Sequence, residues 1–238
     1  MDNHISICSK NVFDDQSFSE IPKNVNVLKL SGNEDLCSDP SIDTIFGTDD
    51  GSYYVFKGSN YWKLTEDSVE RGYPRKISDD WPGLPNNIDA ALTWTDNGKT
   101  YFFKNDEYWK FANQEATPGY PKKITEGFDG IPSDIDAAFV WGGNGKIYFF
   151  KADKYWKFDP SRKPPVRSVY PRNIANWDLP DDIDGALQWS NKRTYFFRKG
   201  EYYRYTDRAR QYDQSKILHN TEPDYLKVKI LFTTRHFL

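Results

Sequence analysis

Cysteine is scarce in this chain, with only Cys8 and Cys37 among 238 residues. Two cysteines allow one bridge at most, which excludes a disulfide-rich scaffold and a cysteine-based zinc site. The mean hydropathy is −0.82, and no run of about 18 apolar residues occurs, so we expect no membrane span. Residues 1–8 also lack a basic stretch followed by about 7 to 15 apolar residues, so this chain shows no secretory signal.

An excess of charge of one sign is missing too, because 32 Lys and Arg face 35 Asp and Glu and leave a net charge of −3. That balance argues against nucleic-acid binding through bulk charge. The only histidines are His4, His219 and His236, and none has a neighbouring Glu. A zinc protease site needs His-Glu-x-x-His. The sequence therefore predicts no zinc and no enzyme.

Aromatic residues are abundant, with 16 Phe, 16 Tyr and 8 Trp, which is typical of a folded chain and not of a disordered one. They recur in a pattern that appears four times. The first element of the pattern lies at residues 42–46, 88–92, 135–139 and 183–187, with starts 46, 47 and 48 residues apart. Such a period indicates a repeat architecture.

Further elements follow each of these. A Tyr-Phe-Phe-Lys-like element lies at residues 54–57, 101–104, 148–151 and 195–198, and a Tyr-Trp-Lys-Phe-like element at 61–64, 108–111, 155–158 and 202–205. Three copies end in a segment that begins with Tyr-Pro, at residues 73–85, 120–132 and 170–180. The fourth copy has no such segment.

The elements are short and rich in aromatic and β-branched residues, and pairs such as Asn97-Gly98 separate them, which favours antiparallel strands. A period near 47 residues predicts an all-β fold, a four-bladed β-propeller, in which blade 4 is incomplete. We expect a disordered leader or linker at 1–36, the propeller at 37–211 and a divergent tail at 212–238. The blades are expected at about 42–87, 88–134, 135–182 and 183–211.

These four motif sets resemble the hemopexin-like repeat family. Within it, the chain is most similar to the C-terminal domain of a secreted matrix metalloproteinase of arthropod type, without the catalytic domain; residues 36–40 and 141–148 support this. The resemblance implies that Cys37 matches a family cysteine whose partner ends blade 4. No second cysteine follows, so we expect an unpaired Cys37 in a truncated or spliced product; pairing with Cys8 is the alternative.

One aspartate recurs at the start of each innermost strand, so rotation about the axis brings four carboxylates and carbonyls toward one channel mouth. The set is Asp43, Asp89, Asp136 and Asp184. Oxygen ligands suit Ca²⁺, and the resemblance implies a channel calcium on their carbonyls. It also implies a deeper ion, chloride or sodium, at the backbone of Ile45, Ala91, Ala138 and Ala186. The alternative is that each Asp makes only a local hydrogen bond.

The resemblance implies a non-catalytic recognition domain of the extracellular matrix. Its expected partners are matrix proteins such as collagen, metalloproteinase inhibitors, or a second copy of the chain. Two alternatives remain, a carrier of haem or another small molecule and a protease fragment without independent function. The proline-rich stretch 162–167 is either an exosite or a solvated loop, and the Trp and Tyr residues of the strands are expected in the core between blades.

Overall fold

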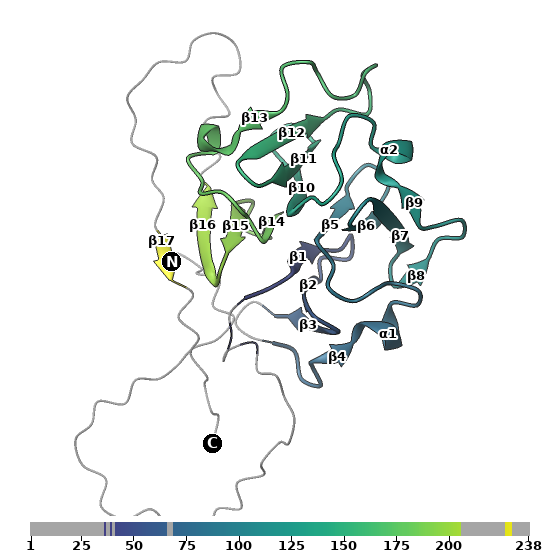
Figure 1. Ribbon diagram of the computed structural model, residues 1–238. Coiled ribbons are helices and arrows are strands. Elements are labelled where there is room, and N and C mark those ends of the chain that lie inside the picture. Colours follow the sequence, from purple (N-terminus) through teal and green to yellow (C-terminus); the bar gives the residue numbers. More distant parts are fainter. Residues whose placement is uncertain (1–35, 37–38, 40, 66–68, 206–226, 230–238) are drawn as a thin grey trace, which may run out of the picture.

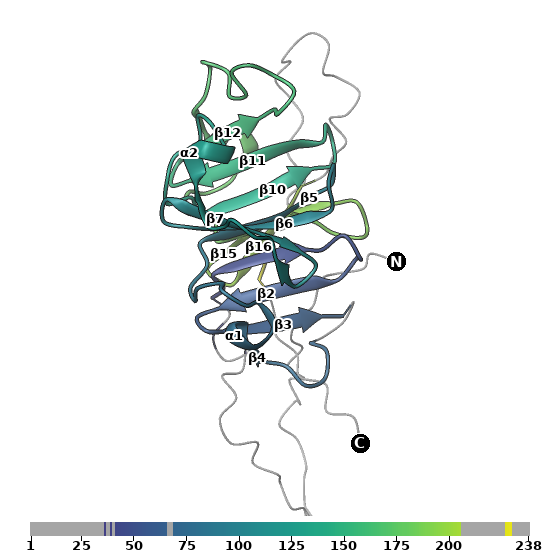
Figure 2. The same cartoon turned by 90° about the vertical axis from the view of Figure 1, so that its right-hand side faces the viewer.

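The computed structural model describes residues 36, 39, 41–65, 69–205 and 227–229. Four antiparallel sheets surround a common centre, and each sheet contains one repeat (Figure 1). The body is flattened when it is seen from the side, and its strands run across its thickness (Figure 2). The predicted all-β, four-bladed propeller is confirmed. No helix in the described ranges is long and apolar enough to cross a membrane.

Blades 1 and 2 come first in the chain. Blade 1 contains β1 (Thr44–Gly47), β2 (Tyr53–Lys57), β3 (Asn60–Leu64) and β4 (Arg75–Lys76), followed by α1 (Ile77–Asp80). Blade 2 contains β5 (Ala90–Trp94), β6 (Lys99–Lys104) and β7 (Glu107–Ala112). Two short strands, β8 (Glu115–Ala116) and β9 (Lys122–Lys123), pair with β7, and α2 (Ile124–Gly127) follows.

Blades 3 and 4 complete the ring. Blade 3 contains β10 (Ala137–Trp141), β11 (Lys146–Lys151), β12 (Lys154–Phe158) and β13 (Arg172–Asn173), followed by the 3₁₀ helix η1 (Ile174–Trp177). Blade 4 contains β14 (Gly185–Gln188), β15 (Thr194–Arg198), β16 (Glu201–Tyr205) and β17 (Lys227–Lys229). Blade 4, which was expected to be incomplete, has a fourth strand in the structure, because β17 pairs with β16. This strand comes from the stretch assigned to the tail, which carries no Tyr-Pro motif.

Asparagine fixes the first hairpin of three blades. The Asn144 side chain donates to the hydroxyl of Tyr148 at 2.9 Å and accepts the amide of Lys146 at 2.9 Å. The same pair of bonds involves Asn97 in blade 2 and Asn191 in blade 4. Because Asn favours such turns and here also binds the following strand, the sequence pattern sets the register of each hairpin.

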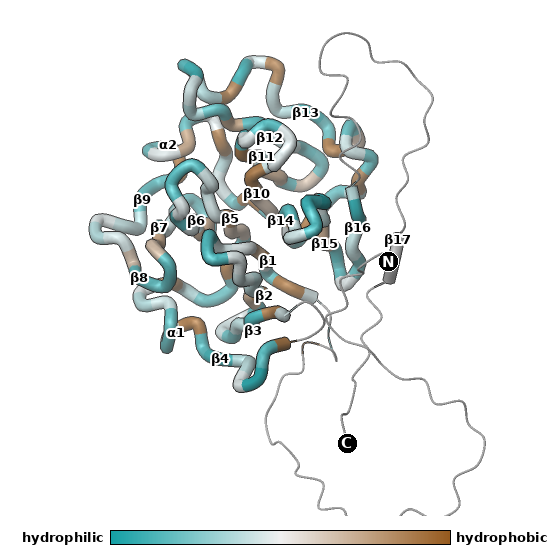
Figure 3. The backbone as a smooth tube through the Cα atoms, turned by 180° about the vertical axis from the view of Figure 1, so that it is seen from behind, coloured by the Kyte–Doolittle hydropathy of each residue, from teal (hydrophilic) through white to brown (hydrophobic). Residues whose placement is uncertain are grey.

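The hydrophobic core lies between the blades. Hydrophobic stretches are visible in the inner strands β1 and β10 (Figure 3). Trp81 and Phe128 follow α1 and α2, and Trp177 is the last residue of η1. Each packs against a Phe of the next blade, with ring centroids 5.2, 5.4 and 5.7 Å apart. These rings therefore join blade 1 to 2, 2 to 3 and 3 to 4.

Blade 4 joins blade 1 through a different set of contacts. Tyr53 and Trp189 stack with ring centroids 3.9 Å apart, and Leu36 is buried in the same cluster. Six tryptophans that lie in or next to the strands belong to or pack against the four clusters between blades, which confirms the predicted core role. They are Trp62, Trp94, Trp109, Trp141, Trp156 and Trp189.

Candidate ion site at the channel mouth

The four repeat aspartates directly precede the innermost strands β1, β5, β10 and β14. One oxygen of each carboxylate accepts a backbone amide from the turn between the second and third strands of the same blade. The acceptor and donor pairs are Asp43 with Gly58 (2.7 Å), Asp89 with Asn105 (2.6 Å), Asp136 with Ala152 (2.6 Å), and Asp184 with Lys199. The bonds span 15 or 16 residues, so they are not the local bonds of the alternative interpretation.

The turn residues that donate these bonds have positive φ angles: Gly58 60°, Asn105 53°, Ala152 49° and Lys199 48°. A non-glycine residue is unfavourable there, so the charged hydrogen bond helps to hold the turn. Three of the same residues also accept an amide from the next blade through their carbonyl groups. The donors are Asn87 (2.9 Å), Asp134 (2.7 Å) and Asp182 (3.3 Å). Each of these three turns thus connects its own inner strand to the segment that leads into the following blade.

The four aspartates meet at one mouth of the channel. They line a cavity of about 430 Å³ together with two further aspartates, and no Lys or Arg is among the lining residues. The lining consists of Asp43, Asn87, Ile88, Asp89, Asn105, Asp134, Ile135, Asp136, Asp182, Ile183 and Asp184. The structure therefore brings together all four residues that the repeats place at this position.

Burial raises the pKa of each of the four repeat aspartates, because a half-buried carboxylate loses hydration. Neighbouring carboxylates raise these pKa values further; Asp89 and Asp182 both act on Asp136, and Asp136 acts on Asp184. The turn amides act in the opposite direction. A cation at this mouth would offset both the lost hydration of the carboxylates and their mutual repulsion.

The nearest basic side chains are not lining residues themselves, but Lys104 and Lys151 contact two residues of the lining, Asn87 and Asp134. Each blade has a Lys or Arg at the end of its second strand, and each donates to a backbone carbonyl of the loop before its own inner strand. The pairs are Lys57 with Asp39 (2.8 Å), Lys104 with Asn87 (2.6 Å), Lys151 with Ser133 (2.8 Å) and Arg198 with Asp181 (2.6 Å). These bonds fix the rim without filling the mouth.

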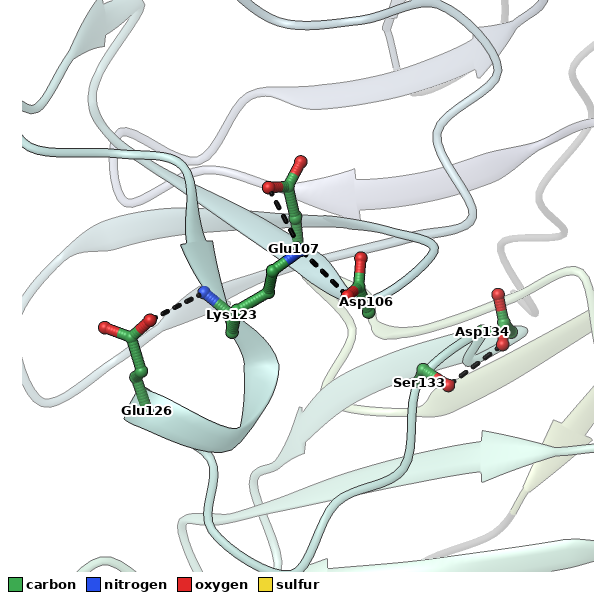
Figure 4. A network of polar contacts seen from close by, with 6 residues as sticks. All are labelled: Asp106, Glu107, Lys123, Glu126, Ser133 and Asp134. Carbon is green, nitrogen blue, oxygen red and sulfur yellow. Dashed lines mark hydrogen bonds and ion pairs between the residues drawn. The ribbon is translucent and has the colours of Figure 1, made fainter.

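Blade 2 shows how the rim is connected to the outer edge (Figure 4). Lys123 of β9 binds Asp106 at 2.8 Å and Glu107 at 3.4 Å, and its backbone amide donates to Glu126 at 3.3 Å. Ser133 donates to Asp134 at 2.9 Å. Asp106 follows Asn105, whose amide binds Asp89, so the Lys123 ion pair lies next to the turn at the blade 2 side of the mouth.

The donor set fits a hard cation only with help from the backbone. Among the described residues, no three or more His, Cys, Asp or Glu side chains lie close enough together to hold a metal ion. One oxygen of each repeat aspartate is already hydrogen-bonded to a turn amide. Calcium accepts carbonyl and water oxygens, so the main-chain carbonyls and second carboxylate oxygens of these residues are the ligands that the site can offer.

The four residues of the expected deeper ion site are not equivalent. Ala91, Ala138 and Ala186 line a second cavity of about 420 Å³ at the opposite end of the inner strands, whereas Ile45 does not. The Ile45 side chain is fully buried in the core between blades 4 and 1. Blade 1 thus breaks the fourfold symmetry at this depth.

The sequence interpretation did not include Asp134, Asp182 and Asn87. Each lies two residues before a repeat aspartate, and each has a positive φ of 51° to 54°. The recurrence of Asn or Asp at this position is the signal that could have identified them, since these residue types tolerate the left-handed conformation. Cys8, Cys37 and all three histidines lie outside the described residues, so the predictions about them stay predictions.

Comparison with known proteins also finds four repeats in this chain. The Hemopexin family profile matches residues 42–86, 88–133, 135–181 and 183–218. Human vitronectin is 50% identical over 42 residues, which are 18% of this chain and 9% of vitronectin. Matrix metalloproteinase-18 of Xenopus laevis is 43% identical over 44 residues, again 18% and 9%. These matches therefore span less than a tenth of either relative.

The crystal structure of a hemopexin fold protein from cow pea superimposes with a TM-score of 0.59 at 20% identity, over 72% of this chain and 89% of that one. This likeness concerns the fold alone. The family profile, by contrast, covers most of the chain, and its four segments begin within two residues of the strands that surround the channel. The chain belongs to the hemopexin family.

Proposed function

We propose that this chain is a non-catalytic recognition domain of the extracellular matrix, related to that of a matrix metalloproteinase. Its partners in this proposal are matrix proteins such as collagen, metalloproteinase inhibitors, or a second copy. The observation that carries the proposal is the four-bladed hemopexin-family ring, together with short but clear similarity to vitronectin and to a matrix metalloproteinase. The chain contains no His-Glu-x-x-His motif, which supports a binding role.

A pull-down tests this role. The purified chain is immobilised and exposed to fibrillar collagen, vitronectin-depleted matrix extract and tissue inhibitors of metalloproteinases, each identified by mass spectrometry. The heat-unfolded chain on the same support is the control. We expect at least one matrix protein or inhibitor to be retained by the folded chain alone. Retention of none, at micromolar concentrations, would contradict the binding role.

We further propose that a calcium ion binds at the mouth lined by Asp43, Asp89, Asp136 and Asp184. The support is their convergence on one cavity without a basic side chain. When bound, the ion would supply positive charge that offsets the repulsion among these carboxylates. The aspartates themselves would hold the turns between the second and third strands, so the ion would stabilise the ring and take no part in a reaction.

Thermal unfolding tests the calcium proposal. A ligand that binds only the folded chain raises the unfolding midpoint by mass action. We expect a higher midpoint in millimolar CaCl₂ than in chelator, and a smaller shift in MgCl₂, because Mg²⁺ demands a tighter octahedral shell. An unchanged midpoint in CaCl₂ would count against the ion while leaving the binding role untouched.

A further inference from the structure

The outer edge of blade 3 differs in charge from the edges of blades 1 and 2. Residues 160–176 contain four basic side chains and no acidic one, whereas residues 66–80 of blade 1 contain five acidic side chains. The stretch begins with the loop that joins β12 to β13, which projects from the rim at the top of Figures 1 and 2. We call its four cations the basic edge; they are Arg162, Lys163, Arg167 and Arg172.

The charges of the basic edge are not neutralised within the described part of the chain. All four side chains are exposed, and none of them forms an ion pair there. In blade 2, by contrast, Lys123 is paired with Asp106 and Glu107 (Figure 4). In blade 1, Arg75 is paired with Asp80 at 2.8 Å. The edges of blades 1 and 2 therefore do not share the excess positive charge of the blade 3 edge.

The loop that carries these charges is held in place. Asp159 accepts from the Ser161 hydroxyl and from Lys146, each at 2.7 Å, and its amide donates to the carbonyl of Pro165 at 3.0 Å. Val166 forms an isolated bridge with Phe158 and packs against the core between blades 2 and 3. A loop that is already ordered loses less entropy on binding than a flexible one.

An apolar side chain lies within the basic edge. Val169 is 43% exposed and is the one large hydrophobic residue of the described chain that is classed as exposed. The Arg172 guanidinium lies over the ring of neighbouring Tyr170, 5.4 Å from its centroid. A sulfated glycan would use the cations but gain nothing from Val169, whereas a protein segment could contact both.

We propose that the basic edge binds an acidic segment of a partner protein, and that the segment also carries apolar side chains. The proposal rests on the binding role given above, and it names a surface and the chemistry of the partner. Opposite charge steers association and selects the partner, and a preordered surface loses less conformational entropy on binding. Val169 would supply the apolar contact that distinguishes such a segment from a simple polyanion.

A random 12-residue peptide library displayed on phage provides the probe. Selection against the immobilised full chain at about 150 mM salt is expected to enrich peptides that combine Asp or Glu with Leu, Ile or Phe. Dissociation constants of the enriched peptides are then measured by fluorescence anisotropy. We compare three proteins: the wild type, the triple variant Arg162→Gln, Lys163→Gln, Arg167→Gln, and the single variant Val169→Ser.

A matched triple variant removes the same number of exposed cations from blades 1 and 2: Arg71→Gln, Lys76→Gln and Lys122→Gln. We expect the blade 3 triple variant to weaken peptide binding at least tenfold, Val169→Ser to weaken it about threefold, and the matched variant to change it less than twofold. All variants should keep the wild-type circular dichroism spectrum and unfolding midpoint, since the exchanged side chains are exposed.

Several outcomes would overturn the proposal. These are a pool of peptides without acidic enrichment, peptides that bind the blade 3 variant as tightly as the wild type, or equal losses in the two triple variants. Heparin serves as a second probe; binding that needs the three cations but is unaffected by Val169→Ser, without any enriched peptide, would make the edge a glycan site instead. A pull-down that still retains a matrix protein would leave the binding role intact in each case.

Discussion

Asp136 and its three counterparts have two roles, because each carboxylate caps a strained turn and also contributes negative charge to the channel mouth. Substitution of Asp136 by Ala or by Asn distinguishes the hydrogen bond from the negative charge. Without calcium at pH 7, Asp136→Ala should lower the free energy of unfolding by about 1–3 kcal/mol, because the Ala152 amide loses a charged acceptor. Asp136→Asn keeps an acceptor oxygen and removes one unfavourable charge, so its stability should stay within about 1 kcal/mol of the wild type.

Urea unfolding in chelator, followed by tryptophan fluorescence, measures both variants of Asp136. The matched pair controls for side-chain size, since Asn is nearly isosteric with Asp. If Asn proved as destabilising as Ala, the negative charge and not the hydrogen bond would be the stabilising feature, contrary to this account.

The side chain of Ile45 fills the space next to Gly185, so a larger residue at position 185 would collide with it. A Cβ at Gly185 would lie 2.9 Å from the Cγ2 atom of Ile45, in the core between blades 4 and 1. Gly185→Ala should therefore destabilise by about 1–3 kcal/mol through overpacking, and Ile45→Ala by about 2–5 kcal/mol through a cavity. The double variant should be less destabilised than the sum, because the new methyl group occupies part of the cavity.

A double-mutant cycle by chemical denaturation checks this coupling of Gly185 and Ile45. Strict additivity of the two changes in unfolding free energy would show that the two side chains do not compete for one space.

Strand β17 is the element that completes blade 4, through pairing of Lys227, Val228 and Lys229 with β16. Deletion of residues 227–238 should expose the amides of β16 and accelerate their hydrogen exchange, since an unpaired edge opens locally. Deletion of residues 230–238 alone leaves β17 in place and serves as the control. Exchange by mass spectrometry that is equal in both deletions would refute the pairing.

The elements show what the sequence could and could not supply. The predicted strand at residues 101–104 is β6, and the Asn-Gly turns lie where expected, because their determinants are local. The hydrogen bond from Ala152 to Asp136 spans 16 residues, and the contact of Gly185 with Ile45 joins the last blade to the first. β17 has no counterpart of the motif at the outer strands of blades 1–3. The Gly185–Ile45 contact depends on closure of the ring, whereas the other two join residues that are distant in sequence within one blade. Short local motifs specify neither kind of contact.

The ring as a whole should respond to pH through its mouth. Burial raises the folded-state pKa of the four repeat aspartates above the usual value of 3.8. Between the unfolded-state pKa of about 3.8 and the raised folded-state pKa, the folded chain binds more protons than the unfolded chain. The contribution of these carboxyl groups to stability therefore falls as pH rises from about 3.8 toward neutrality. Above the raised pKa values the four aspartates are ionised in both states, so their contribution to the free energy of unfolding no longer changes with pH.

The pH effect is isolated by comparison with a variant in which all four repeat aspartates are Asn. In chelator, the unfolding free energy of the wild type minus that of the variant should decrease between pH 3.5 and pH 6, as measured by urea unfolding at each pH. An increase across this range would mean that the mouth stabilises ionised carboxylates without a metal, which is the opposite of the sign argued here.

The closed ring also has one junction unlike the others. Amides of Asn87, Asp134 and Asp182 connect consecutive blades through the turn carbonyls, but in the described chain no equivalent bond links blade 4 to blade 1. That junction relies on the Tyr53–Trp189 stack and its apolar cluster. A cation that draws all four inner strands together would therefore matter most there.

A crystal structure of the chain grown in CaCl₂, with an anomalous difference map, tests the central assignment most directly. The account predicts one calcium peak on the channel axis at the mouth, with carbonyl or carboxylate oxygens of Asp43, Asp89, Asp136 and Asp184 at about 2.3–2.6 Å. A mouth that shows only water under these conditions, or four aspartates that do not surround one axis, would contradict it.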